Sequence, residues 1–272
     1  MEPKDRIILP LDVDSVQKAT NLVELLAPYV GPFKVGLEFI NTMLASLILP
    51  KDREEAESNL WAIRRLFDLL SGKIFWDGKF DDIPNTVAGA SIPVAKMGVR
   101  MFNVHASAGR ESVVKAVANK GNALVLGVTV LTSIDSKECV FIFGQEPGTK
   151  VLRFALMLAD VKADGIICSP HELSLIRTLP DLDSLLTITP GVRPEWAAVG
   201  DQKRVMTPGE AIRAGADYLV IGRPITQPPS EIGGPVKAAK RIAAEIAEAL
   251  ETRQKLNKIV DKISLKEVKY VQ

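Results

Sequence analysis

The sequence predicts an α/β protein built as a single (β/α)8 TIM barrel. Three observations lead to this prediction: a length of 272 residues, a strict alternation of short apolar runs with longer amphipathic segments, and eight repeats of that alternation. One barrel of this kind takes about 250 residues. The length alone also allows two domains of about 150 residues each, and the alternation alone allows an open parallel sheet. The eightfold repeat favours the closed barrel.

The predicted strands are short runs rich in apolar and β-branched residues. Some of them, such as the run around Leu124, are apolar on both faces, which is typical of a parallel sheet covered by helices. The eight runs are 7–11, 33–37, 74–76, 100–104, 123–130, 165–168, 185–189 and 218–221.

Longer amphipathic segments separate these runs, and their first residues include Ser, Thr and Pro, which are common at helix N-termini. The region 41–71, after the second strand, is too long for one helix. Pro50 and the charged residues that follow it indicate a break between two helices. The other predicted helices are 15–27, 86–96, 110–118, 149–159, 172–178 and 208–214.

The chain divides into a barrel domain, residues 1–250, and a basic C-terminal tail, residues 251–272, which we expect to be helical. From Thr252 to Gln272 there are six Lys or Arg and two acidic residues. Such a tail could contact an anionic partner, although this composition is more often that of a solvated terminal helix.

Charge and cysteine content exclude several classes of protein. With 34 Lys and Arg against 33 Asp and Glu, the chain lacks the basic surplus of a general binder of nucleic acid or of acidic membranes. Cys139 and Cys168 lie far apart, which argues against a disulfide scaffold or zinc site and favours the cytoplasm. The longest apolar stretch, 123–131, is about half the roughly 20 residues that span a bilayer, and we expect no signal peptide.

Charged residues stand where the first three predicted strands end. Asp12 closes the first strand, Lys34 lies on the second, and Asp77, Lys79 and Asp82 follow the third. The C-terminal ends of barrel strands are where ligands bind. Charges there are costly unless paired, so two lysines and two of the aspartates (77 and 82) are predicted to form a compact network. The alternative is that each is an isolated surface charge.

A second cluster lies near the C-terminus, where Gly222 and Arg223 follow the last predicted strand. In many barrels the loops after strands seven and eight bind phosphate. Glycine allows backbone N–H groups to approach the anion, and arginine adds a bidentate charged contact. We therefore predict a phosphate site, the alternative being an ordinary Gly-Arg turn.

No cofactor or metal is expected. There is no GxGxxG motif, and the segment 31–36 has the spacing of a P-loop start, but Leu37 stands where the lysine is needed. His105 and His171 have no partner at metal-ligand spacing, so we interpret both as structural or capping residues. Lysine and aspartate are then left to carry any catalysis on a small phosphorylated substrate.

The segment 77–86, DGKFDDIPNT, resembles the signature of the orotidine 5′-phosphate decarboxylase family, Asp-x-Lys-x-x-Asp followed by Ile-Pro-Asn-Thr. The first part alone also marks related sugar-phosphate decarboxylases and aldolase-like barrels, and the Ile-Pro-Asn-Thr extension makes the resemblance specific. Further matches follow in family order at 9–12, 33–36, 128–133, 189–194, 201–208 and 216–224.

The resemblance implies cofactor-free decarboxylation of orotidine 5′-monophosphate (OMP) to UMP and CO2, in de novo pyrimidine biosynthesis, by a homodimer with shared active sites. It implies that Lys79 donates a proton to C6 of the pyrimidine within a network of Lys34, Asp77, Lys79 and Asp82, with Asp82 reaching into the partner's site. The substrate-binding residues that it implies are Asp12 for the ribose, Thr132 for the base, and Lys34, Asp77, Ile83, Pro84, Thr86, Pro190, Arg193, Gln202, Gly222 and Arg223.

Two residues depart from the family pattern, because Gly78 and Asp81 stand where members often have a larger residue and a histidine.

Two other functions stay open. A metal-assisted sugar-phosphate decarboxylase or aldolase would need one more carboxylate, for which Glu38 is the only candidate. A non-catalytic barrel that binds a phosphorylated ligand would not need both lysines and both aspartates.

Overall fold

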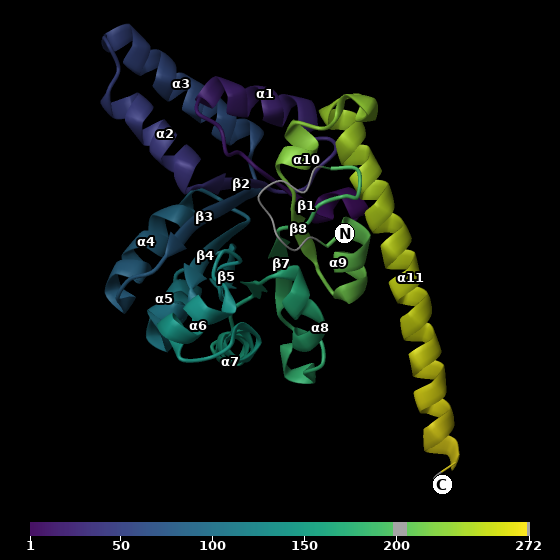
Figure 1. Ribbon diagram of the computed structural model, residues 1–272. Coiled ribbons are helices and arrows are strands. Elements are labelled where there is room, and N and C mark those ends of the chain that lie inside the picture. The colour runs from purple at the N-terminus through teal and green to yellow at the C-terminus, as the bar shows by residue number, and fades with distance from the viewer. Residues whose placement is uncertain (198–205, 271–272) are drawn as a thin grey trace.

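Eight parallel strands form a closed barrel (Figure 1), as the sequence predicts. The computed structural model describes residues 1–197 and 206–270, with side chains described up to residue 256. Each strand pairs with the next along the chain, and β1 pairs with β8 to close the ring. The strands are β1 (Ile7–Pro10), β2 (Phe33–Gly36), β3 (Ile74–Phe80), β4 (Met101–His105), β5 (Leu124–Val128), β6 (Gly165–Ile167), β7 (Leu186–Pro190) and β8 (Tyr218–Val220).

Helices cover the outside of the ring. Several begin at residues that satisfy free backbone N–H groups: the Ser15 side chain accepts from Lys18 N, and Thr207 forms a capping box with Glu210. The α-helices are α1 (Val16–Leu26), α2 (Leu37–Ile48), α3 (Arg53–Leu69), α4 (Pro84–Lys96), α5 (Arg110–Ala118), α6 (Ser136–Phe143), α7 (Pro147–Asp160), α8 (Leu173–Ile176), α9 (Pro208–Ala214), α10 (Arg223–Thr226) and α11 (Pro235–Tyr270).

The extended region after the second strand consists of two helices, α2 and α3, which lie side by side (Figure 1). The break falls where the sequence places it, because α2 ends before Pro50 and Asp52 caps the N-terminus of α3 by accepting from Glu55 N. The helix α2 begins earlier than expected, at Leu37, directly after Gly36 ends β2.

The core has two layers. The larger one lies between the strands and the surrounding helices. The smaller one fills the inside of the barrel with side chains from alternate strand positions, most of them in the N-terminal half of their strands. The C-terminal ends of the strands are therefore not filled by this inner layer and leave room for a site. The buried residues of the inner layer are Ile8, Phe75, Met101, Leu126, Ile188 and Tyr218.

The last helix, α11, is 36 residues long. At 1.5 Å per residue it extends about 54 Å, and Figure 1 shows it continuing well beyond the barrel. Its buried side chains include Ile242, Ile246 and Ala249, which pack against the rest of the barrel. The helix crosses residue 250 without interruption, and the division of the chain at that point stays a prediction. No described helix combines the length and the apolar character needed to cross a bilayer.

Candidate active site

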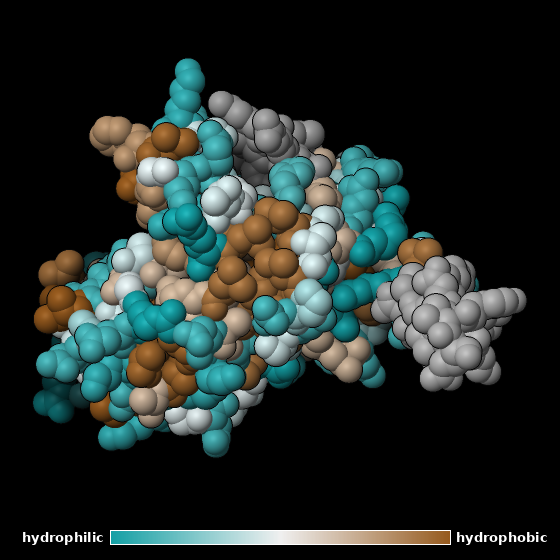
Figure 2. All heavy atoms as spheres, turned by 90° about the horizontal axis from the view of Figure 1, so that it is seen from below, coloured by the Kyte–Doolittle hydropathy of each residue, from teal (hydrophilic) through white to brown (hydrophobic). Residues whose placement is uncertain are grey.

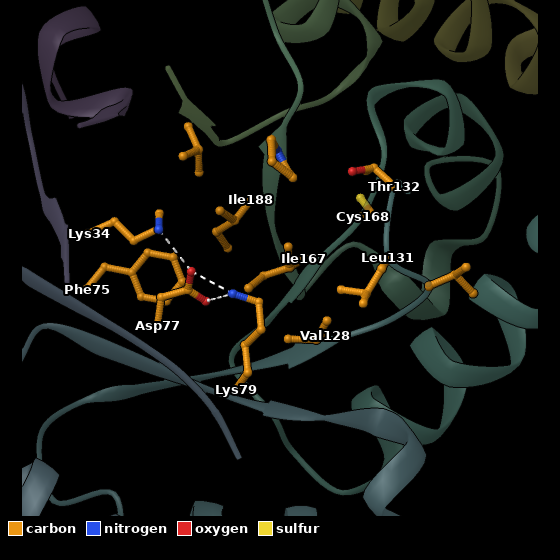
Figure 3. A pocket seen from close by; sticks show the side chains of 13 residues that line it. Lys34, Phe75, Asp77, Lys79, Val128, Leu131, Thr132, Ile167, Cys168 and Ile188 are labelled. Carbon is orange, nitrogen blue, oxygen red and sulfur yellow. Dashed lines mark hydrogen bonds and ion pairs between the residues drawn. The ribbon is translucent and has the colours of Figure 1, made fainter. Parts of the chain in front are cut away.

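A cluster of paired charges lies at the C-terminal ends of β1, β2 and β3 (Figure 3). Lys34 on β2 lies between two carboxylates: its Nζ is 3.1 Å from Asp12 Oδ1 and 3.1 Å from Asp77 Oδ2. The Asp77 side chain is only 7% exposed, whereas that of Asp12 is 47% exposed. The cluster therefore extends from the barrel interior to solvent.

Lys79 contacts the same buried carboxylate from the other side. Its Nζ is 2.8 Å from each carboxylate oxygen of Asp77. Both residues lie within β3, which continues to Phe80, beyond its expected end at residue 76. Asp77 is thus held between two ammonium groups, one on β2 and one on its own strand.

The electrostatics of the cluster follow from this arrangement. Burial favours the neutral form of Asp77, but the charges of Lys34 and Lys79, with hydrogen bonds from Lys79 and Asn103, outweigh it and lower the pKa of Asp77. Burial likewise opposes the charge on Lys34, yet Asp77 and Asp12 raise the pKa of Lys34 above its usual value. Both groups are therefore charged at neutral pH.

The cluster forms one end of a cavity of about 220 Å³ in the mouth of the barrel (Figure 3). The rest of the wall is mainly apolar, so a ligand in this cavity would meet charged side chains only at the end formed by the cluster. Thr132 and Pro190, two of the predicted substrate-binding residues, lie on this wall. The other lining residues besides Lys34, Asp77 and Lys79 are Phe75, Val128, Val130, Leu131, Ile167, Cys168, Ile188 and Val220.

A second cavity, of about 380 Å³, adjoins Asp12 and contains the predicted phosphate residues. Gly222 caps the N-terminus of α10, and Arg223 is its first residue. Asp12 and Arg223 line this cavity together with Lys18 and Asn21 of α1. The predicted ribose and phosphate residues are thus neighbours, next to the charged cluster.

The other predicted site residues are placed differently. Arg193 is 8% exposed in the segment after β7, where its backbone N–H donates to Met206 O at 3.0 Å. Gln202 lies outside the described residues. Asp82 is exposed and accepts a hydrogen bond from its neighbour Ile83 N at 2.7 Å. Within the described part of this chain it forms no ion pair with a lysine.

Ile83, Pro84 and Thr86 lie with Asp82 at the start of α4, outside the cavity that holds the charged cluster. Ile83 is 66% exposed. A single chain therefore brings together Asp12, Lys34, Asp77 and Lys79, but not the Asp82 segment.

Sequence reasoning missed Asn103, a fully buried residue in the middle of β4. Its side chain hydrogen-bonds to both Asp77 and the backbone of Lys79. Its position in the sequence could have indicated a role, because a polar residue at the centre of an apolar strand is buried and needs hydrogen-bond partners. His105, at the end of the same strand, also lies near the cluster, and burial lowers its pKa.

The side chains of Trp76 and Phe80 occupy the space next to Gly78. A β carbon at Gly78 would lie 2.9 Å from Trp76 Nε1 and 3.0 Å from Phe80 Cε1. The volume that a larger residue would occupy is therefore filled by the neighbouring aromatic side chains. Asp81 is exposed, directly after the end of β3.

Comparisons with known proteins find similar sequences over most of this chain. The model of the orotidine 5′-phosphate decarboxylase / HUMPS family matches residues 5–242. The orotidine 5′-phosphate decarboxylase of Moorella thermoacetica is 42% identical over 258 residues, which cover 90% of this chain and 94% of the relative. That of Syntrophomonas wolfei is 40% identical and is covered over its full length, with 91% of this chain.

A solved structure also resembles the barrel. The crystal structure of orotidine 5′-phosphate decarboxylase from Lactobacillus acidophilus superposes with a TM-score of 0.67 at 28% identity, covering 89% of this chain and 99% of that one. The family model, over residues 5–242, includes the strands that carry the charged cluster as well as those that form the apolar wall. This chain belongs to the orotidine 5′-phosphate decarboxylase / HUMPS family.

Proposed function

We propose that this protein decarboxylates OMP to UMP and CO2, as an orotidine 5′-phosphate decarboxylase of de novo pyrimidine biosynthesis. The observation that carries this proposal is the alternating array of Lys34, Asp77 and Lys79 at the end of an otherwise apolar cavity. Relatives that are about 40% identical over nine-tenths of the chain carry the same function in their names. The reaction needs no cofactor in this proposal.

Lys79 is the proposed proton donor. Breaking the bond between C6 and the carboxylate carbon releases CO2 and leaves an electron pair on C6, with little delocalisation. A fixed ammonium group beside C6 stabilises this developing negative charge. The Lys79 ammonium then transfers a proton to C6, which gives UMP, and the neutral amine regains a proton from water.

Asp77 is the proposed neighbour of the substrate carboxylate. Its own negative charge is maintained by two ammonium groups, so it disfavours a second carboxylate at the same place. Loss of CO2 removes that repulsion. Lys34 would hold Asp77 in place and, through Asp12, connect the reacting end of the site to the ribose.

The phosphate end would supply binding energy far from the reacting bond. Gly222 and Arg223 are the proposed phosphate ligands, with Arg193 and Gln202 from the segment after β7. Binding energy from such a remote group can be used to orient the base and exclude water from C6. Thr132 and Pro190, on the cavity wall, would contact the base.

The active enzyme in this proposal is a homodimer with shared sites. Asp82, Ile83, Pro84 and Thr86 lie outside the cavity of their own chain, and Ile83 exposes 66% of its surface. Figure 2 shows hydrophobic side chains gathered in patches on one face of the molecule. Exposed apolar patches are common where subunits meet. Asp82 would complete the charged network of the partner subunit.

The proposed setting is the cytoplasm, because both cysteines are buried as free thiols, which is typical of a reducing compartment. With nearly equal numbers of acidic and basic residues, nucleic acid and membranes are not proposed as partners.

The decisive experiment follows the fall in absorbance of OMP as purified protein converts it to UMP, with and without EDTA. We expect turnover in both conditions. Turnover that EDTA abolishes would favour a metal-assisted member of the superfamily, and binding of OMP without turnover would favour a non-catalytic barrel.

A further inference from the structure

Asn103 connects the two central residues of the site through one side chain. Its Nδ2 donates to Asp77 Oδ1 at 2.5 Å, and its Oδ1 accepts from the backbone N–H of Lys79 at 2.7 Å. The residue is fully buried, so water does not replace either partner. A single amide thus contacts the proposed carboxylate and the backbone of the proposed proton donor.

The backbone of β3 is irregular at this point. Trp76 pairs with Phe102 and Phe80 pairs with Val104, so residues 77, 78 and 79 of β3 all lie opposite Asn103. Lys79 has a φ of 47°, in the left-handed region that a residue with a β carbon rarely adopts. The N–H of Lys79 donates to the side chain of Asn103, which lies on the neighbouring strand β4.

We propose that Asn103 is a positioning residue for the decarboxylation, an inference that rests on the proposed function. Its carbonyl oxygen holds Lys79 in the left-handed conformation that directs the ammonium to Asp77 and the cavity. Its amide N–H fixes the rotamer of Asp77 and stabilises the ionised carboxylate. Asn103 touches neither the substrate nor C6, and acts only through these two residues.

Only a side chain with both a donor and an acceptor can make this connection. Aspartate has the same shape and can accept from Lys79 N, but it cannot donate to Asp77 and would place a second negative charge beside it. Alanine removes both hydrogen bonds and leaves the Lys79 N–H and one Asp77 oxygen without this partner in a buried site.

The charged and polar groups around Asp77 determine how its pKa changes when Asn103 is replaced. Lys34 on β2 and Lys79 on β3 stabilise its charge, as does the hydrogen bond from Asn103. His105 on β4 lies within electrostatic range of Asp77, and Asp12 acts on the adjacent Lys34. Since the lysines are unchanged in an Asn103 variant, loss of the amide should raise the pKa of Asp77.

The test compares the wild type with Asn103→Ala and Asn103→Asp, in kcat, KM and the pH profile of kcat/KM for OMP. Thr187→Val is the matched control. Thr187 is also fully buried on a strand, and its hydroxyl donates to Gly215 O at 3.0 Å, but it lies at the opposite end of the barrel.

For both Asn103 variants we expect kcat to fall by about 100-fold, the typical cost of displacing a catalytic group by about 1 Å. KM should change little, and the acid limb of kcat/KM should move to higher pH. Thr187→Val should lower stability but leave kcat and the acid limb at their wild-type values. Asn103→Asp keeps the volume of the side chain, so it tests the proposal even if Asn103→Ala does not fold.

An unchanged kcat and acid limb in the Asn103 variants, or the same changes in Thr187→Val, would overturn the positioning role. If the wild type itself does not decarboxylate OMP, the proposed function fails instead. The positioning role is then decided by crystal structures of the two variants. In Asn103→Ala, which removes the acceptor, Lys79 should leave the left-handed region, and in Asn103→Asp, which removes the donor, the Asp77 carboxylate should turn away from residue 103. A retained φ near 47° in the first or an unmoved Asp77 in the second would overturn it.

Discussion

Lys34 Nζ occupies the space where a side chain at Gly36 would begin. A β carbon at Gly36 would lie 2.6 Å from Lys34 Nζ, 3.5 Å from Asp12 Oδ1 and 3.7 Å from Asp77 Oδ2. The missing side chain therefore makes room for the ion pairs that connect β1, β2 and β3.

Gly36→Ala should disrupt the charged cluster without disrupting the barrel. We expect kcat/KM for OMP to fall by about 10- to 100-fold, because the Lys34 ammonium must shift from the position in which it pairs with both carboxylates. The control is Gly89→Ala on α4, where a β carbon meets nothing within 4 Å. That variant should keep its activity and gain up to about 1 kcal/mol of stability. Equal activity of the two variants would contradict the role of Gly36.

Lys79→Ala should abolish turnover and leave binding measurable. Removing both the proton donor and the cation beside C6 should lower kcat by at least about 10⁴-fold. Titration with UMP measures binding in the same variant. Lys96→Ala, at an exposed position on α4, serves as the control. Near-normal turnover in Lys79→Ala would refute the proposed donor.

Arg223→Ala should mainly weaken substrate binding. A lost charged hydrogen bond of about 1.5–3 kcal/mol corresponds to a rise in KM for OMP of roughly 10- to 100-fold. Steady-state kinetics measure this rise, with Arg64→Ala on the exposed face of α3 as a control. An unchanged KM would count against the phosphate assignment.

Asp82→Ala and Lys79→Ala subunits should complement each other if the sites are shared between subunits. Each variant alone lacks one residue in both sites of its dimer. A mixed dimer has one intact site, so an equal mixture, after dissociation and reassociation, should recover about a quarter of wild-type activity. Activity that stays at the sum of the separate variants would rule out the shared site.

Glu172→Gln should remove a pH dependence of stability. Burial raises the pKa of Glu172 to about 7, although Ser169 N donates a hydrogen bond to it, whereas its ordinary value is 4.5. Between these values the unfolded chain has released the proton and the folded chain retains it, so stability falls as pH rises from about 4.5 to 7. Thermal unfolding at pH 5 and pH 8 measures the loss.

In that experiment the Glu172→Gln variant should lose less stability than the wild type between the two pH values. Glu138→Gln, at an exposed position on α6, should lose as much as the wild type. If Glu172→Gln loses as much stability as the wild type between the two pH values, another group is responsible.

The barrel could be predicted from the sequence because its strands are buried on both faces and read as continuous apolar runs. The charged residues at the ends of these runs could be found for the same reason, since Asp12 and Asp77 interrupt apolar surroundings. Pro50 and Asp52 likewise mark the break between α2 and α3, as a residue that ends helices and one that caps them.

Other features depend on contacts between distant segments. The irregular pairing at Asn103 is set by the register of β4 against β3, which no local pattern encodes. Lys79 adopts a conformation that its own propensity disfavours, because Asn103 provides a hydrogen bond there. The proposed partner of Asp82 belongs to a second subunit, so the structure of a single chain does not bring the two groups together.

The closure of the ring has a consequence for how the chain is made. Ile7 pairs with Leu219 and Ile8 with Val220, so β1 keeps an unpaired edge until almost the whole barrel has been synthesised. The charged cluster of Asp12, Lys34, Asp77 and Lys79 lies, with Asn103, within the first 103 residues, whereas most of the apolar wall comes later. A ribosome-bound chain ending before residue 218 would therefore carry the reactive groups without an enclosed cavity. Closing the ring is a late, non-local step, and it is the step that shields the site from water.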